Sequence, residues 1–100
     1  MSEMKLITCV MHEKLSQGVI EYLKDEMNII TANKFSARGT TYIEHLESKQ
    51  MDVLTVVVDE SRAQEVFEYI HEHSQIDRPH GGMIFQERLG RCTSYELPNL

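Results

Sequence analysis

The chain has 100 residues, of which 41% are hydrophobic and 26% charged, and its 16 acidic residues outnumber its 10 basic ones, for a formal net charge of −6. This composition is typical of a single folded domain and excludes a disordered chain. No cluster of Lys and Arg is present, which argues against nucleic acid as a partner. No apolar run is long enough for stable membrane insertion. The N-terminus lacks the pattern of a secretion signal, so we expect a cytoplasmic protein.

Strand-like and helix-like patterns alternate along the chain. Short apolar runs predict strands near residues 4–11, 29–35, 51–58 and 83–87. Amphipathic segments predict helices near residues 14–28 and 61–74. The order is β-α-β repeated twice, which is the order of a ferredoxin-like fold. We therefore predict one α+β domain over residues 1–100, a βαββαβ sandwich in which an antiparallel sheet carries two helices on one face.

The third predicted strand indicates that the chain assembles with copies of itself. The run Val53-Leu54-Thr55-Val56-Val57-Val58 is almost continuously apolar. A strand that faces water on one side alternates polar and apolar residues, and this one does not. Because the two helices cover only one face of the sheet, we expect another subunit to cover the second face.

Two segments between the predicted elements are candidates for function. Residues 36–50 form a long connection for so small a domain, and such connections are often functional. The turn His80-Gly81-Gly82 precedes the last strand. Its glycines permit positive φ and a close approach of the backbone to a ligand or a neighbouring chain, and its N–H groups can hold an anion. The alternative is a tight turn with no ligand.

These features together resemble the PII signal-transduction proteins. The resemblance extends over residues 4–87 and rests on the β-α-β order, the opening Met4-Lys5-Leu6-Ile7-Thr8, the long loop after the second strand, and the turn His80-Gly81-Gly82-Met83-Ile84-Phe85. In that family the turn reads Gly-x-Gly-Lys-Ile-Phe. The resemblance implies a homotrimer built by packing sheets together, adenine nucleotides bound between subunits, and a T-loop that signals to a target protein.

The sequence also departs from the PII pattern. Met83 occupies the position of a phosphate-binding lysine, and residues 36–50 are too few for a full T-loop. Lys34-Phe35-Ser36-Ala37-Arg38-Gly39 resembles the family's Gly-Phe-Gly-Arg with glycines replaced. The resemblance is thus to a divergent member with a shortened T-loop. It implies a ligand with less phosphate charge, such as AMP, another small anion or a metabolite.

The expected ligand site lies in a cleft between subunits. Arg38 is expected to bind an anionic group of the ligand through two parallel N–H donors, and the threonine hydroxyls are expected to donate hydrogen bonds to the same group. The N–H groups of the glycine turn complete the site. The expected ligand-binding residues are Arg38, Gly39, Thr40, Thr41, Gly81, Gly82, Met83, Arg88 and Arg91. We expect no enzymatic activity, because the sequence displays no nucleophile–base pair or paired carboxylates.

Histidine offers an alternative function. The chain has five His residues, and His45 and His80 could together hold Zn or Cu by ligand type. Such a site would resemble that of the trimeric CutA-type proteins, which bind divalent metals. His71 and His73 are two residues apart on a predicted helix and so cannot share one ion.

Overall fold

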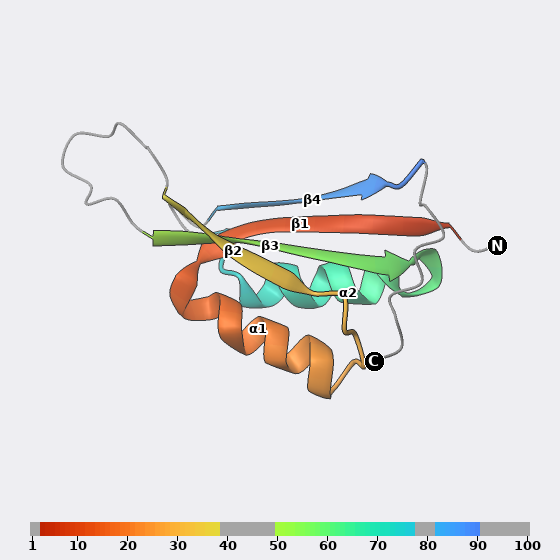
Figure 1. Cartoon of the computed structure of the whole chain (residues 1–100), viewed down its shortest axis with the longest axis horizontal. Helices are drawn as coiled ribbons and strands as arrows, with labels where there is room; N and C mark the ends of the chain where they lie inside the picture. Colours follow the sequence, from red (N-terminus) through yellow and green to blue (C-terminus); the bar gives the residue numbers. More distant parts are fainter. Residues whose placement is uncertain (1–2, 39–49, 78–81, 91–100) are drawn as a thin grey trace.

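The computed structural model describes residues 3–38, 50–77 and 82–90. Its elements, shown in Figure 1, follow the predicted order: β1 (Met4–His12), α1 (Glu13–Asp25), β2 (Asn33–Arg38), β3 (Gln50–Asp59), α2 (Glu60–His73) and β4 (Met83–Arg88). The strands form one sheet in the order β2-β3-β1-β4, and all pairings are antiparallel. The predicted ferredoxin-like fold is confirmed.

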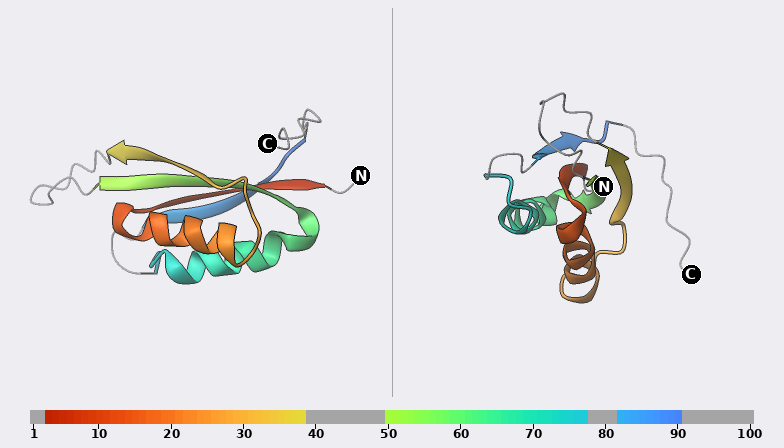
Figure 2. Two further views of the ribbon diagram at one scale, coloured as in Figure 1. Left: turned by 60° about the horizontal axis from the view of Figure 1, so that its bottom comes forward. Right: turned by 90° about the vertical axis from the view of Figure 1, so that its left-hand side faces the viewer.

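Both helices cover the same face of the sheet (Figure 2). Each helix buries residues spaced by three and four positions, which places them on one side of the helix. Alternate residues of β1 and β3 point toward these helices and are buried with them. The core comprises Ile7, Cys9, Met11, Val19, Leu23, Ile29, Leu54, Val56, Val58, Ala63, Val66 and Ile70. Neither helix in the described residues has the length and apolar character that a membrane span requires.

The predicted helices are confirmed, with starts one residue earlier than expected. The N-cap of α2 is Asp59, whose side chain accepts a hydrogen bond from the N–H of Ser61 at 2.9 Å.

Cys9 lies in the core, and burial raises the pKa of its thiol to about 11. A thiol in that environment stays protonated and behaves as a small apolar side chain.

The predicted bounds of the second strand, residues 29–35, are wrong at both ends. β2 spans Asn33–Arg38, so residues 36–38, which we expected in the long connection, pair with β3. Asn28 adopts a left-handed conformation, with φ of 59°, and the N–H of Ile29 donates to the carbonyl of Leu23 at 2.8 Å. This arrangement is a helix C-terminal cap. The chain joins the sheet only where Asn33 pairs with Thr55. The apolar pair at residues 29 and 30 resembled a strand, but Ile29 instead closes the core beside α1.

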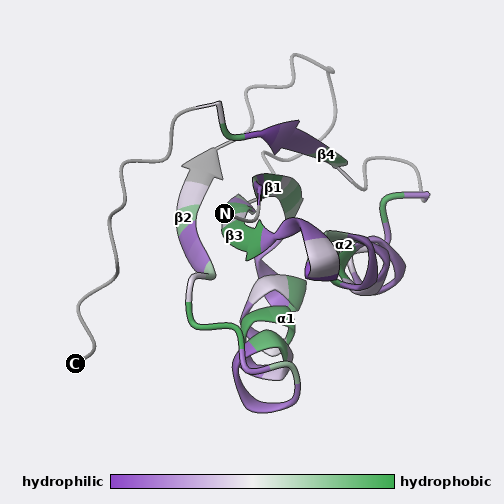
Figure 3. Cartoon of the chain, turned by 90° about the vertical axis from the view of Figure 1, so that its right-hand side faces the viewer, coloured by the Kyte–Doolittle hydropathy of each residue, from purple (hydrophilic) through white to green (hydrophobic). Residues whose placement is uncertain are grey.

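The second face of the sheet, which we call the outer face, is covered by neither of the helices in the described residues. Directly paired residues of an antiparallel sheet project to the same side, so Phe35, Val53, Val10 and Met83 form one row across the four strands. Phe35 is 54% and Met83 56% exposed, and Phe85 in the next row is 39% exposed. Viewed along the strands in Figure 3, both helices lie on the other side of the sheet.

Candidate functional site

The loop base and the glycine turn lie at the same end of the sheet. Arg38 ends β2 and is paired with Gln50, His12 ends β1 and is paired with Met51, and Met83 begins β4. This is the left-hand end of the sheet in Figure 1. Two strands separate β2 from β4, so the two segments lie about 14 Å apart within one chain at a strand spacing of about 4.8 Å.

Several predicted site residues lie outside the described part of the chain. These residues are Gly39, Thr40, Thr41, Gly81 and Arg91, together with the alternative metal ligands His45 and His80. Of Arg38, the structure describes the backbone alone. Within residues 3–38, 50–77 and 82–90, no three His, Cys, Asp or Glu side chains come together as a group that could hold a metal ion.

Arg88 lies at the other end of β4 from the glycine turn. Five residue steps separate it from Met83, which is roughly 17 Å along a strand. Its guanidinium forms an ion pair with Glu3, and the hydrogen bond from Arg88 lowers the pKa of that carboxyl. Within a single chain, Arg88 is therefore not brought together with Gly82 and Met83.

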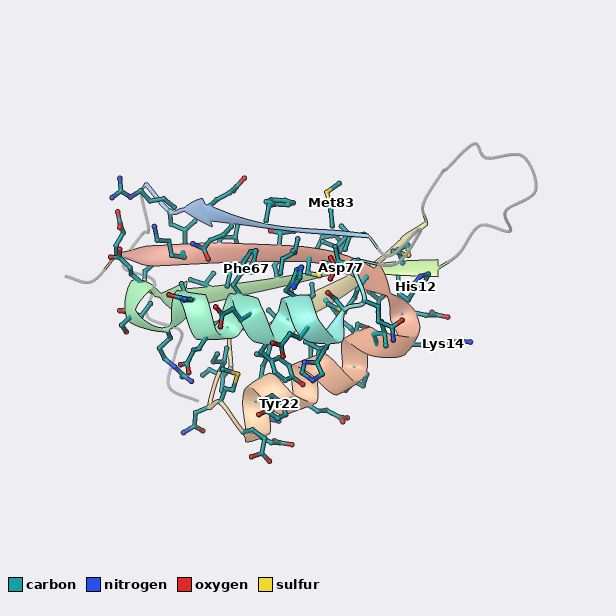
Figure 4. All side chains as sticks on the ribbon, turned by 180° about the vertical axis from the view of Figure 1, so that it is seen from behind. His12, Lys14, Tyr22, Phe67, Asp77 and Met83 are labelled. Carbon is teal, nitrogen blue, oxygen red and sulfur yellow. The ribbon has the colours of Figure 1, made fainter. Side chains whose placement is uncertain are left out.

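Gly82 makes a close approach, as the sequence indicated, but its neighbour is a strand of the same chain and not the ligand or neighbouring chain that we expected. Its φ is 102°, a conformation that favours glycine. A Cβ at this position would lie 1.8 Å from the carbonyl oxygen of Val10. Glycine is thus required to bring the start of β4 against the end of β1. The next residue, Met83, projects from the sheet on the side away from the helices (Figure 4).

A polar cluster, formed by buried Ser16 and Asp52 with partly exposed Lys34, lies beneath this end of the sheet. Asp52 is 4% exposed and Ser16 is fully buried. The Ser16 hydroxyl contacts the carboxylate of Asp52. The ammonium of Lys34 lies 3.7 Å from that carboxylate and donates to the Ser16 hydroxyl at 3.3 Å. The cluster therefore ties α1 to both strands that flank the long loop.

The cluster borders a pocket of about 340 Å³ that is lined by Glu13, Lys14, Lys34, Phe35, Ser36 and Asp52. A lysine beside a serine can activate the hydroxyl in some enzymes, but here Ser16 is completely buried and cannot meet a substrate. The arrangement is suited to holding the strands in place. A signal in the sequence could have found it, because Asp52 occupies a core-facing position of β3 and a buried carboxylate needs a partner.

We predict that Gly82→Ala destabilises the fold by about 2 kcal/mol or more, because the new Cβ collides with β1 and the backbone is strained. The matched control is Gly18→Ala in α1, where a Cβ meets no atom within 4 Å. That substitution should stabilise the protein by up to about 1 kcal/mol. Urea denaturation measures both changes. Equal urea midpoints for Gly82→Ala and Gly18→Ala would contradict the close approach of Gly82 to the Val10 carbonyl.

We predict that Lys34→Met lowers the free energy of unfolding by about 1–2 kcal/mol, because it leaves the Asp52 carboxylate buried without its cation. The expected loss is smaller than for a fully buried ion pair, because the Lys34 side chain is partly exposed. The double variant Lys34→Met, Asp52→Leu should recover much of the loss. Lys24→Met, at an exposed position of α1, is the control. Additive losses in the double variant, measured by urea denaturation, would show that the pair is not coupled.

No protein-family model and no curated protein matches the sequence. Solved structures do resemble this fold. A functionally unknown protein from Pediococcus pentosaceus has a TM-score of 0.73 at 16% identity, over 95% of this chain and 100% of that one. PII from Arabidopsis thaliana, bound to citrate, has a TM-score of 0.67 at 17% identity, over 86% of this chain and 74% of that one. At these identities the likeness concerns the fold, and the chain has the fold of a PII protein.

Proposed function

We propose that the chain is a cytoplasmic PII-like regulatory protein, a homotrimer that binds a small anionic ligand between its subunits. The ligand orders the connection between β2 and β3, which signals to a target protein. The observation that carries this proposal is the uncovered apolar outer face in a chain with a PII fold. An enzymatic role is not part of the proposal.

The outer face supports assembly because three large apolar side chains, Phe35, Met83 and Phe85, are between 39% and 56% exposed in the single chain. Patches of this kind mark interaction sites in soluble proteins. The row from Phe35 to Met83 extends across all four strands, so a partner sheet would bury it as one surface. Three copies related by a closed rotation bury the same patch on every subunit, in agreement with the trimer that the PII resemblance implies.

The position of the loop base supports a ligand at this end of the sheet. Arg38 ends β2, and an arginine presents a planar pair of donors to a carboxylate or phosphate. The structurally similar PII from Arabidopsis thaliana is bound to citrate, a small polyanion. Because Arg38 and the glycine turn are about 14 Å apart in one chain, an extended nucleotide reaches both. A smaller anion contacts both only where one subunit's loop base meets its neighbour's turn.

The uncharged Met83 side chain favours a ligand with few phosphate groups. A lysine at that position would contribute one positive charge to a polyphosphate, and methionine contributes none. The ligand class that fits is a carboxylate, bicarbonate or a nucleoside monophosphate.

We predict that the protein sediments at three times the mass of its chain at micromolar concentration. Val53→Glu should convert it to a folded monomer, because the new carboxylate would be buried without a partner in the interface. Gln17→Glu, on the exposed side of α1, adds the same charge and should leave the trimer intact. Sedimentation equilibrium measures the mass and circular dichroism the folding. A wild-type monomer would overturn both the trimer and the intersubunit site.

We predict that a small anion raises the melting temperature of the wild-type protein and not of Arg38→Ala. Citrate, bicarbonate, AMP, ATP and Zn²⁺ form the panel, because a ligand that binds only the native state stabilises it, by about 2.7 kcal/mol at 100 times its Kd. Lys24→Ala removes an exposed lysine of α1 and should keep the full shift.

Two results of the same panel would contradict the proposal. Stabilisation by Zn²⁺ alone, lost in His80→Ala, would favour the metal-binding alternative. If no compound raised the melting temperature, binding of these ligand classes would be excluded, and only the fold and the proposed assembly would remain.

A further inference from the structure

Three aromatic rings form a stacked column on the helical layer. The ring centroids of Tyr22 in α1 and Tyr69 in α2 are 4.1 Å apart, with planes 5° from parallel. The imidazole of His73 stacks on Tyr69 at the same separation, 21° from parallel. Tyr69 is therefore covered on both ring faces. One face of Tyr22 has no stacking partner in the described residues, and Tyr22 is 42% exposed.

The column is held firmly by the two helices. The Nδ1 atom of His73 lies 2.9 Å from the carbonyl oxygen of Tyr69, so its N–H donates to that carbonyl and fixes the imidazole. Figure 4 shows Tyr22 at the lower edge of the helical layer, on the opposite side of the molecule from Met83. Among the described residues, the column thus ends in an exposed tyrosine that has a ring on one face only.

A glycine lies one turn before Tyr22. Gly18 is in the middle of α1, where glycine destabilises a helix relative to alanine. Packing among the described residues does not require it, because an added Cβ would meet nothing within 4 Å. Helical side chains lean toward the N-terminus, so the ring of Tyr22 lies over the turn that contains Gly18. The missing side chain leaves that edge of the ring open.

Three exposed carboxylates lie within one helical turn of the column. Residues three and four positions away on a helix share a face, which places Asp25 and Glu26 beside Tyr22 and Glu72 beside Tyr69. All three are exposed, and none forms an ion pair within the described residues. A fourth carboxylate, Glu65, one turn before Tyr69, is already paired with Arg62 at 2.8 Å. The platform is therefore an aromatic face bordered by uncompensated negative charge.

We infer that this platform, formed by Gly18, Tyr22, Tyr69 and His73 with Asp25, Glu26 and Glu72, is a docking site for an arginine-bearing basic segment of a partner protein. A guanidinium stacks flat on the free face of Tyr22, above Gly18, and the carboxylates attract it and its basic neighbours. Lysine fits less well, because its ammonium is compact and cannot stack as a plane. The platform lies opposite the outer face, so it stays accessible in the proposed trimer and does not depend on it.

The test is fluorescence anisotropy with a fluorescein-labelled peptide of three Arg-Gly-Gly repeats and a matched peptide with Lys in place of Arg. The wild-type protein should bind the arginine peptide several times more tightly. Tyr22→Leu should weaken binding about tenfold by removing the ring, while Tyr22→Phe keeps it. Gly18→Gln, which fills the space beside the ring, should also weaken binding, and circular dichroism shows whether each variant is folded.

A charge-matched pair separates this site from general attraction to an acidic protein. Glu72→Gln should weaken binding by a factor of about three or more. Glu13→Gln, which removes the same charge at the far end of α1, should not change it. Equal losses in these two variants, equal affinity for both peptides, or full binding by Tyr22→Leu would each overturn the inference.

Discussion

The constraint on which the structure depends is that its sheet carries apolar side chains on two faces and has helices for one. Leu54 and Val56 point into the core beneath α1 and α2, while Val53 and Val57 point to the outer face. Burial of apolar area is the main favourable contribution to folding. The inner face supplies it within one chain, whereas no described helix covers the outer face, and we propose that other copies of the chain do so.

This constraint separates the molecule into surfaces with different roles. The outer face is suited to assembly. The end of the sheet where β2 meets β3 has its strands fixed by Ser16, Lys34 and Asp52, so a loop that leaves it starts from a rigid base. The helical layer faces the other way and carries the aromatic platform that we propose as a docking site. In the proposed function, docking on the helical layer therefore does not compete with assembly on the outer face, whereas Met83 belongs to both the outer face and the expected ligand site.

The fold could be predicted from the sequence because the periodicities of two and 3.6 residues are strong and agree with the β-α-β order. The start of β2 could not, because an apolar pair such as Ile29-Ile30 has no period that distinguishes a strand from a core-closing turn. The close approach of Gly82 was foreseen, yet only the structure shows that its neighbour is Val10 of the same chain. The column from Tyr22 to His73 joins residues that are distant in sequence, and no spacing rule brings them together. The ligand-binding residues stay a prediction.

The central claim is that copies of the chain cover the outer face. Hydroxyl-radical footprinting across a dilution series tests it most directly, because it reports the solvent exposure of individual side chains. Met83, Phe35 and Phe85 should be protected several-fold at high protein concentration and become reactive on dilution, while Tyr22 on the helical layer stays reactive throughout and serves as the internal standard. If the reactivity of Met83, Phe35 and Phe85, each taken relative to Tyr22, did not change across the dilution series, the account would be contradicted.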